Sequence, residues 1–275
     1  MNINQKTEEA GRPIGVFDSG IGGLTVVKEL NRLLPNERII YFGDTARVPY
    51  GNKSKETVID YSLQIAYFLM KKKIKMLVVA CNTASSVSLP TLKRHLHIPV
   101  LGVIEPGSKA AIENTKNQNI GVIGTLGTIN SNSYKKALKK INSRVKITQL
   151  PCPLFVQLAE DGWNKNHIAQ AVSDEYLKNF KGRNIDAMIL GCTHYPMLKE
   201  VIQNSVGKRV RLIDSGVETA KEAKRILGKK GLLSIQKMSE RNHSVFYVSD
   251  FPHKFKTVSQ RFLGKELKHV HKVTL

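Results

Sequence analysis

Short apolar runs alternate with helix-like segments along most of the chain, and this alternation limits the folds it can adopt. The runs are rich in β-branched residues, and they lack the strict apolar–polar alternation of a strand with one wet face. Strands buried on both faces of a parallel sheet have this composition. We therefore expect strands at residues 14–17, 38–42, 76–80, 99–104, 120–123, 187–190, 210–213 and 245–248.

The segments between these runs have the periodicity of helices that bury one face. In residues 55–70 one stripe gathers the apolar and small side chains, and Ser54 is placed to cap the first turn. That stripe consists of Val58, Ser62, Ile65, Ala66 and Leu69. Residues 23–34 and 196–206 show the same pattern. Strands that alternate with helices favour an α/β architecture with mostly parallel sheets.

A weak internal repeat divides the chain into two similar halves. GVFDSGIGG at residues 15–23 resembles GVIGTLGT at 121–128. Downstream of each, an apolar run ends in a cysteine followed by small polar residues, as VVACNTA at 78–84 and MILGCTH at 188–194. Ligands of open α/β sheets bind beyond the carboxyl ends of the strands. Two facing halves would therefore place Cys81 and Cys192 in one cleft.

Length and composition exclude several classes of protein. A chain of 275 residues, 41% of them hydrophobic, can bury a sizeable core in one large domain or two smaller ones. No apolar run approaches the roughly 20 residues of a membrane helix, and residues 1–13 lack the apolar stretch of a secretory signal. Three cysteines cannot all pair with one another. We therefore expect a cytoplasmic protein without a membrane segment.

The charge of the chain is strongly positive. Lys and Arg number 43 against 22 Asp and Glu, which gives a net charge of +21 and a pI near 9.9. Such a charge attracts anionic substrates and polyanions. The lysines are scattered, and no zinc-finger, basic-zipper or RNP-type motif accompanies them. A solvated basic surface is the first interpretation, and weak binding of nucleic acid or another polyanion stays open.

The glycine-rich turn at residues 18–25 invites a nucleotide-binding hypothesis, which its details oppose. The turn is not G-x-G-x-x-G, and the chain has no G-x-x-x-x-G-K-[ST] motif. The carboxylate of Asp18 would also repel a phosphate placed above it. What the turn does offer is a set of backbone N–H donors at a helix start, which suit a carboxylate.

Cys81 and Cys192 have the surroundings of reactive cysteines. Each follows a predicted strand and precedes a predicted helix start, where the helix dipole favours a thiolate. Neighbouring side chains can hold a polar ligand; they are Asn82, Thr83 and Thr193. Cys152 lies between two prolines without such a context, so we expect it to be structural.

The residues weigh against a metal site and against a hydrolase. No Cys-x₂-Cys or His-x₃-His spacing is present, so we expect no metal. A Cys–His hydrolase needs one nucleophile and one base, and it leaves the second matching cysteine unexplained. Two equivalent thiols that face each other suit another task, because one can remove a proton while the other delivers one. Inversion of a stereocentre requires that division of labour.

Five motifs together resemble the glutamate racemases of the aspartate/glutamate racemase family. They are GVFDSGIGGLT at 15–25, YFGDTARVPYG at 41–51, ACNTAS at 80–85, GVIEPG at 102–107 and LGCTHYP at 190–196. They occur in the family's order and, with the flanking chain, cover residues from about 15 to 216. The Cys-Thr-His form of the last motif is closer to glutamate racemases than to aspartate racemases, whose equivalent more often reads Cys-Thr-Glu.

The resemblance implies racemisation of glutamate without a cofactor, by transfer of protons at the α-carbon between two thiols. Cys81 would deprotonate D-glutamate and Cys192 would deprotonate L-glutamate. The assisting residues would be Asp18 beside the first thiol and His194 beside the second. The family's helper glutamate matches Glu160, and the neighbouring Asp161 leaves that register open. The substrate contacts would be Asp18, Ser19, Tyr50, Gly51, Asn82, Thr83, Thr193 and His194.

The resemblance also implies an architecture and a biological setting. It implies two doubly wound, flavodoxin-like domains with mostly parallel sheets, related by a pseudo-twofold axis, with the active site in the cleft between them. The first domain would comprise residues 1–103 and 210–275, and the second residues 104–209. The expected product is D-glutamate for peptidoglycan in the cell wall, and the expected assembly is a homodimer.

Two alternatives remain at this point. Side-chain length of the substrate is not legible in the motifs, so a racemase of another acidic amino acid such as aspartate stays open. The surplus of lysine keeps a second task open, namely binding of nucleic acid or modulation of DNA gyrase, which is reported for some members of the family. Loss of racemisation in Cys81→Ser or Cys192→Ser would support the enzyme, whereas strongly salt-dependent DNA binding that survives both changes would support the second task.

Overall fold

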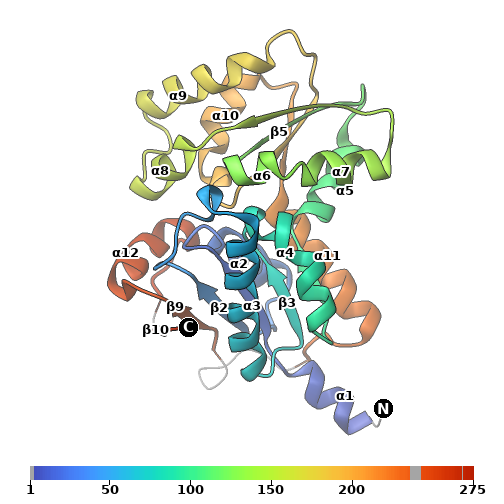
Figure 1. Cartoon of the computed structure of the whole chain (residues 1–275), viewed down its shortest axis with the longest axis vertical. Coiled ribbons are helices and arrows are strands. Elements are labelled where there is room, and N and C mark those ends of the chain that lie inside the picture. The colour runs from blue at the N-terminus through green and yellow to red at the C-terminus, as the bar shows by residue number, and fades with distance from the viewer. Residues whose placement is uncertain (1–2, 236–242, 268) are drawn as a thin grey trace.

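The computed structural model describes residues 3–235, 243–267 and 269–275, which form two units stacked along the long axis (Figure 1). Each unit is built on its own sheet, with helices packed against it. The six-stranded unit, built on β1–β4, β9 and β10, lies below in Figure 1 and contains both ends of the chain. The four-stranded unit, built on β5–β8, lies above it.

Every strand pair in the described part of the chain is parallel, as the composition of the apolar runs predicted. The first sheet has the order β10-β9-β2-β1-β3-β4, and the second has the order β6-β5-β7-β8. The strands are β1 (Ile14–Asp18), β2 (Ile39–Gly43), β3 (Met76–Val79), β4 (Val100–Gly102), β5 (Asn119–Gly124), β6 (Lys146–Pro151), β7 (Ala187–Gly191), β8 (Arg211–Asp214), β9 (Val245–Val248) and β10 (Val270–Lys272).

Helices connect these strands. The α-helices are α1 (Ile3–Ala10), α2 (Leu24–Leu33), α3 (Lys55–Lys71), α4 (Asn82–His95), α5 (Ile104–Asn114), α6 (Leu126–Asn130), α7 (Ser133–Ile141), α8 (Leu154–Asp161), α9 (His167–Leu177), α10 (Lys199–Val206), α11 (Ser215–Lys230) and α12 (Pro252–Leu263). Short 3₁₀ helices are η1 (Tyr50–Asn52), η2 (Lys178–Phe180) and η3 (Tyr195–Leu198).

The two sheets repeat one strand order. The segment β2-β1-β3-β4 of the first sheet corresponds to the whole second sheet, β6-β5-β7-β8. In such an order the second strand lies on one side of the first strand, and the third strand lies on its other side. The resulting switch points lie between β1 and β3 and between β5 and β7. The predicted α/β class with two parallel sheets is therefore confirmed.

All eight predicted strands are present, and the described residues contain two further strands that the prediction missed. Strand β6 forms an edge of the second sheet and is only half buried, so its sequence KITQLP carries no continuous apolar run. Strand β10 has three residues and lies at the edge of the first sheet. Edge strands with one wet side do not show the pattern on which the prediction relied.

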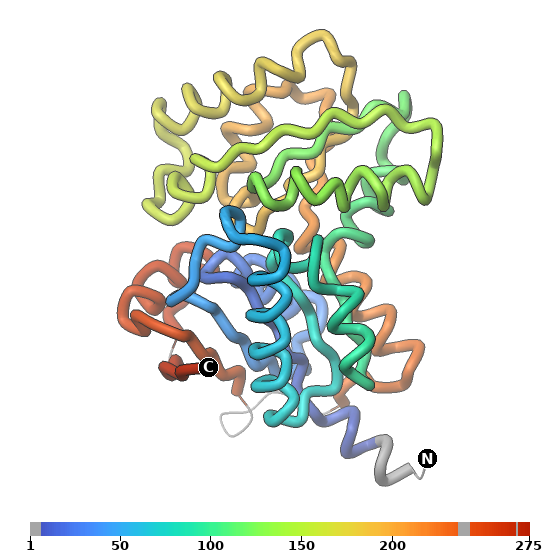
Figure 2. The backbone as a smooth tube through the Cα atoms, in the orientation of Figure 1, coloured from blue at the N-terminus to red at the C-terminus, as the bar shows by residue number. Residues whose placement is uncertain are grey.

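The chain crosses between the units twice (Figure 2). It passes upward from β4 into α5 and returns from β8 into α11. Strand β8 pairs with β7 and so belongs to the four-stranded unit. The domain boundaries remain a prediction, and the pairing of β8 favours a second boundary a few residues after 210.

Alternate residues of the central strands point into separate cores. In β1, Val16 packs with Leu24 and Val27 of α2, whereas Phe17 packs with residues of α3 and α4 on the other sheet face. The second sheet likewise has one core on each face. Burial on both faces explains why these strands read as continuous apolar runs.

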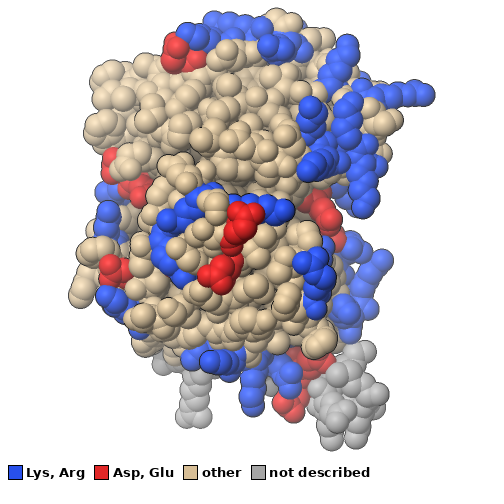
Figure 3. All heavy atoms as spheres, in the orientation of Figure 1, with Lys and Arg blue, Asp and Glu red and all other residues tan. Residues whose placement is uncertain are grey.

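Basic side chains are spread over the face that Figure 3 shows. Helix α7 alone contributes four exposed lysines, which are Lys135, Lys136, Lys139 and Lys140. Binding of a polyanion by this surface stays a prediction. In the described parts of the chain, no helix combines the length and the apolar character needed to cross a membrane.

A buried ion pair ties the amino-terminal edge of the first sheet together. The ammonium of Lys75 lies 2.5 Å from the carboxylate of Glu37, and both side chains are almost fully buried. The same ammonium donates to the carbonyls of Ala10 and Leu232. Glu37 also accepts a hydrogen bond from the backbone N–H of Ser234. Four segments distant in sequence therefore meet at this pair.

We predict that Lys75→Met lowers the free energy of unfolding by about 3–5 kcal/mol, because it leaves the Glu37 charge buried without a partner. The double variant Lys75→Met/Glu37→Gln should recover part of the loss, since it removes that charge. The control Lys71→Met changes an exposed lysine and should stay within about 0.5 kcal/mol of the parent. Urea unfolding measures all three, and an unchanged stability of Lys75→Met would contradict the prediction.

Candidate functional site

The carboxyl ends of four central strands meet where the two sheets face each other. Asp18 is the last residue of β1, and its carboxylate accepts a hydrogen bond from the hydroxyl of Thr193, which follows β7 (3.5 Å). Thr83 follows β3, and its hydroxyl bonds that of Thr125, which follows β5 (2.9 Å). The predicted site residues from both halves of the chain therefore gather at both switch points.

Cys81 caps the amino terminus of α4. Its Sγ accepts a hydrogen bond from the backbone N–H of Ala84 (3.4 Å), and the thiol donates to the hydroxyl of Ser19 (3.6 Å). The side chain is buried. Burial, reinforced by the negative charge of Asp18, raises the pKa of Cys81 to about 12. Without a ligand, Cys81 is therefore a protonated thiol at neutral pH.

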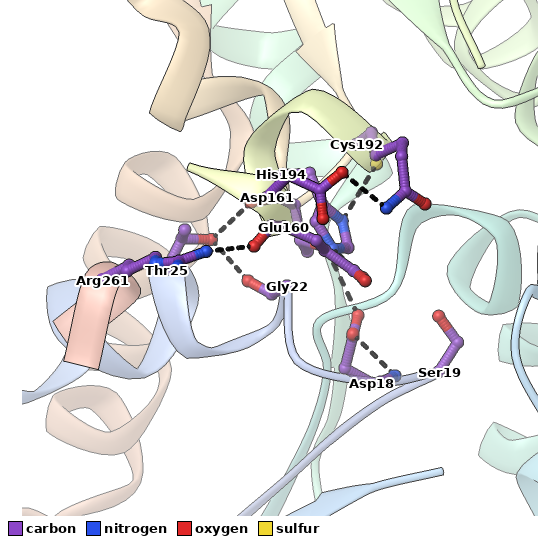
Figure 4. Close-up of polar contacts among 12 residues, drawn as sticks. Asp18, Ser19, Gly22, Thr25, Glu160, Asp161, Cys192, His194 and Arg261 are labelled. Atoms are coloured by element: carbon purple, nitrogen blue, oxygen red, sulfur yellow. Dashed lines mark hydrogen bonds and ion pairs between the residues drawn. The ribbon is translucent and has the colours of Figure 1, made fainter. Parts of the chain in front are cut away.

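Cys192 lies at the matching position after β7, and its neighbouring side chains differ from those of Cys81. Its Sγ is 3.7 Å from Nδ1 of His194, and Nε2 of His194 is 3.0 Å from a carboxylate oxygen of Glu160 (Figure 4). Thiol, imidazole and carboxylate thus form a chain of three groups. His194 is 6% exposed, so water has little access to its ring.

The imidazole of His194 is held in its charged form. Burial by itself lowers the pKa of His194, but hydrogen bonds and charges of Cys192 and Glu160 outweigh that effect. The net result is a pKa well above the usual value for histidine. Cys192 therefore has a cation as its neighbour, whereas Cys81 has the anion of Asp18 as its neighbour.

Asp18 lies between the two thiol environments. Burial raises the pKa of Asp18, while the charge of His194 and the backbone N–H groups of Gly20 and Gly23 oppose the rise. One carboxylate oxygen accepts the N–H of Gly20 at 3.0 Å. Asp18 is 1% exposed and is therefore a carboxylate withdrawn from water at the floor of the site.

The structure distinguishes the two candidate helper carboxylates. Glu160 bonds His194, whereas Asp161 is exposed and accepts a hydrogen bond from Gln157 (2.9 Å). Both residues lie in the last turn of α8 and point in different directions. The geometry favours Glu160 as the residue that assists His194.

The glycine-rich turn after β1 packs directly against His194, the neighbour of Cys192. A Cβ added at Gly22 would lie 2.3 Å from the hydroxyl oxygen of Thr193 and 2.5 Å from the His194 ring. The hydroxyl of Thr25 donates to the carbonyls of Gly22 and Thr193, both at 2.9 Å. The turn therefore brings two backbones into close approach, and Gly22 leaves the room that Thr193 and His194 occupy.

Asn82 offers a donor to a ligand. Its side-chain carbonyl accepts a hydrogen bond from the hydroxyl of Tyr134 in the other unit (2.7 Å). Its Nδ2 is buried and has no hydrogen-bond partner in the part of the chain that the structure describes. A buried amide donor without a partner is costly, so this group is suited to a polar ligand.

Three threonine hydroxyls line the contact between the units. The Thr83 hydroxyl lies 2.9 Å from that of Thr125 and 3.3 Å from that of Thr128, and the last two are 3.0 Å apart. Thr125 also caps the short helix α6. A hydroxyl can turn its proton toward or away from a neighbour, so this cluster can reorganise around a carboxylate.

Tyr50 and Gly51, two predicted substrate contacts, differ in what they contact. The hydroxyl of Tyr50 donates to the carboxylate of Asp44, which also accepts from Nε of Arg47 at 2.7 Å. Tyr50 is buried, and its polar end is engaged within its own loop. The backbone of Gly51 instead approaches the other unit, since a Cβ added there would lie 3.1 Å from Cβ of Thr125.

The third cysteine lies in a hydrophobic core. Cys152 is buried with Phe155 and Leu190, and burial raises its pKa above the usual value for a thiol. Among the described residues, no group of three or more His, Cys, Asp or Glu side chains has an arrangement that could hold a metal ion.

The structure adds residues to the site that the sequence did not single out. Thr25 lies in a motif that was recognised, but nothing marked its side chain. Tyr134 and Phe262 contact Asn82 and His194, respectively, and both lie outside every recognised motif. Only the placement of α7 and α12 in space reveals them.

The comparisons with known proteins identify the family. The sequence profile described as Asp/Glu/Hydantoin racemase matches residues 14–223. These residues include β1–β8 and both cysteines that face the contact between the units. The chain belongs to this family of racemases.

Individual relatives are similar over nearly their whole length. The glutamate racemase of Geobacter metallireducens is 51% identical over 264 residues, which cover 96% of this chain and 97% of that protein. A crystal structure of glutamate racemase from Francisella tularensis in complex with D-glutamate is 42% identical, with a TM-score of 0.89 and coverage of 96% and 98%. A glutamate racemase isoform from Bacillus anthracis is 40% identical, with a TM-score of 0.91 and the same coverage.

We predict that the pKa of His194, followed by NMR of the labelled imidazole, lies above its ordinary value of about 6.5. Glu160→Gln should lower it, because the variant removes the carboxylate charge beside Nε2. A raised native pKa stabilises the fold fully below the unfolded value, and this stability is lost as the pH rises through the native pKa. Glu160→Gln should therefore lose stability at pH values below the native pKa of His194, and it should differ little from the parent above that pKa.

The control for this titration is His95→Gln, which changes an exposed histidine on α4. It should leave the titration of His194 in place. An identical pKa of His194 in the parent protein and in Glu160→Gln would contradict the ion pair.

Proposed function

We propose that this chain interconverts L-glutamate and D-glutamate by proton transfer at the α-carbon, with Cys81 and Cys192 as the two bases and no cofactor. The observation that carries the proposal is the pair of cysteines after corresponding strands of two sheets with the same strand order. Relatives named glutamate racemase, one of them bound to D-glutamate, support the choice of substrate.

From L-glutamate, the Cys192 thiolate would take the α-proton, and the Cys81 thiol would deliver its proton to the opposite face. The products are D-glutamate, a Cys192 thiol and a Cys81 thiolate. The reverse reaction uses the same two groups with their protonation states exchanged. The charge and the atoms balance in both directions, and solvent re-equilibrates the thiols between turnovers.

The surroundings of the thiols suit these opposite tasks. The cation of His194 stabilises a thiolate on Cys192, and Glu160 keeps that imidazole protonated. Cys81, with its raised pKa, starts as a proton donor. When a substrate binds, its ammonium group would add the positive charge that the Cys81 side lacks, and Asp18 is placed to receive that ammonium.

Burial and hydrogen-bond donors would lower the cost of a carbanion next to a carboxylate. Cys81, Cys192, Asp18 and His194 are each at most 6% exposed, so charges interact strongly there. The Asn82 amide and the starts of α4 and α6 supply donors for the carboxylates of a substrate. Ser19 and Thr193 would bind the substrate close to Cys81 and Cys192, respectively.

The wider setting is part of the same proposal. The D-glutamate would enter peptidoglycan synthesis in the cytoplasm, and the protein would act as a homodimer. Racemisation of aspartate is the competing activity, and the substrate test below separates the two.

The first experiment measures deuterium incorporation at Cα by NMR in D₂O, from pure L-glutamate and from pure D-glutamate, without added cofactor. Both enantiomers should exchange with inversion. Cys81→Ser and Cys192→Ser should each lower racemisation about 10²–10⁴-fold or more, because each removes one acid–base partner. The control Cys152→Ala should stay active. Exchange of aspartate alone would replace the substrate, and no exchange of either amino acid would overturn the proposal.

The roles of the two thiols can also be tested one at a time with a substrate analogue of L- or D-configuration. With 3-chloroglutamate, removal of the α-proton expels chloride from the neighbouring carbon, and hydrolysis of the enamine gives 2-oxoglutarate and ammonium. One base suffices for this elimination. Cys81→Ser should therefore keep elimination from the L-configured analogue only, and Cys192→Ser from the D-configured analogue only. Loss of both eliminations in either variant would contradict the assignment of the bases.

A further inference from the structure

Helix α12 belongs to the six-stranded unit, but its last turn contacts the catalytic residues of the other unit. The helix packs against α2 and β10, and Phe255 and Phe262 are part of that unit's core. Its carboxyl-terminal end faces α8 of the four-stranded unit (Figure 1). Two successive residues, Arg261 and Phe262, make the contacts.

Arg261 binds the end of α8. Its Nη1 donates to the backbone carbonyl of Glu160 at 2.6 Å (Figure 4). That carbonyl lies in the last turn of α8, where helix geometry leaves carbonyls without partners in the helix. A cation at the carboxyl end of a helix is also favoured by the helix dipole. The guanidinium lies over Gly162, whose added Cβ would come within 3.3 Å of its Cζ.

Phe262 fixes the ring with which Glu160 pairs. Its ring meets the imidazole of His194 edge to face, with centroids 5.6 Å apart and planes at 90°. Phe262 is 1% exposed and embedded in the core of the six-stranded unit, so it is a rigid wall. Neighbouring residues of one helix therefore touch both members of the pair that serves Cys192.

We propose that Arg261 and Phe262 are positioning residues that hold Glu160 and His194 in register from the opposite unit, so that Cys192 becomes a base only while the two units are in contact. The inference rests on the proposed function. Neither residue reaches the reacting atoms, and each acts through its neighbour. Cys81 and Asp18 belong to the six-stranded unit themselves and need no such support.

The first test compares Arg261→Met with Arg261→Gln, which keeps an N–H donor but loses the charge. Racemisation should fall about 10²-fold in the first variant, as expected for a catalytic group displaced by about 1 Å, and should recover partly in the second. The matched control Lys256→Met removes one positive charge from the same helix and should stay near the parent.

The second test uses the one-base eliminations, because a merely structural role would lower both. Arg261→Met should slow elimination from L-3-chloroglutamate in the Cys81→Ser background about as strongly as it slows racemisation. It should leave elimination from the D-configured analogue unchanged in the Cys192→Ser background. Equal loss in both backgrounds, or loss in neither, would overturn the inference while leaving the proposed function intact. Absence of elimination in both parent backgrounds would instead count against the proposed function.

The titration of His194 gives a readout that does not depend on activity. The titratable groups near its ring are Cys192, Glu160 and Asp18. If Arg261 acted only by its charge, its removal would raise the pKa of His194, because a nearby cation would be lost. If Arg261 positions Glu160, its removal should lower that pKa. Phe262→Leu should lower it too, and a rise in both variants would refute the positioning role.

Discussion

Parallel strand pairing decides where the chemistry of this protein can occur. In each sheet the central strand sends its two connections to opposite sides, so a gap opens beyond the carboxyl ends of β1 and β3, and again beyond β5 and β7. The units are stacked with these gaps facing each other, as the contact of Asp18 with Thr193 demonstrates. The polar side chains around the two cysteines depend on that arrangement, because Asp18 ends β1, Asn82 begins α4, and Thr193 follows β7.

A repeated scaffold carries two unlike electrostatic environments. The strand order is the same in both sheets, and each cysteine follows the third strand of its half. Yet Cys81 has an anionic neighbour, whereas Cys192 has a histidine that a carboxylate keeps charged. The repeated backbone therefore supplies two matching positions for a thiol, and the residues around them give the two positions neighbours of opposite charge. A reaction that adds and removes a proton at one carbon can use both features.

The sequence predicted what depends on local pattern and failed where tertiary packing decides. Continuous apolar runs located eight strands correctly, because burial on both faces leaves a strong compositional signal. Strand β6 was missed since an edge strand is only half buried. In the carboxyl-terminal region the apolar run predicted β9, but nothing in the sequence singled out β10, which completes the edge of the first sheet, or the residues by which α12 enters its core. The register of Glu160 against Asp161 also needed the structure, because adjacent carboxylates on a helix look alike in sequence.

The empty side-chain position at Gly22 has a consequence for how this sequence can vary. Every other amino acid carries a Cβ, and at this position that atom would overlap the space held by Thr193 and the His194 ring. No single codon change that replaces the residue avoids the overlap, whatever the chemical character of the new side chain. A substitution at position 22 therefore requires that Thr193 and His194 shift or change as well. The glycine-rich turn and the segment after β7 are thus constrained to change together.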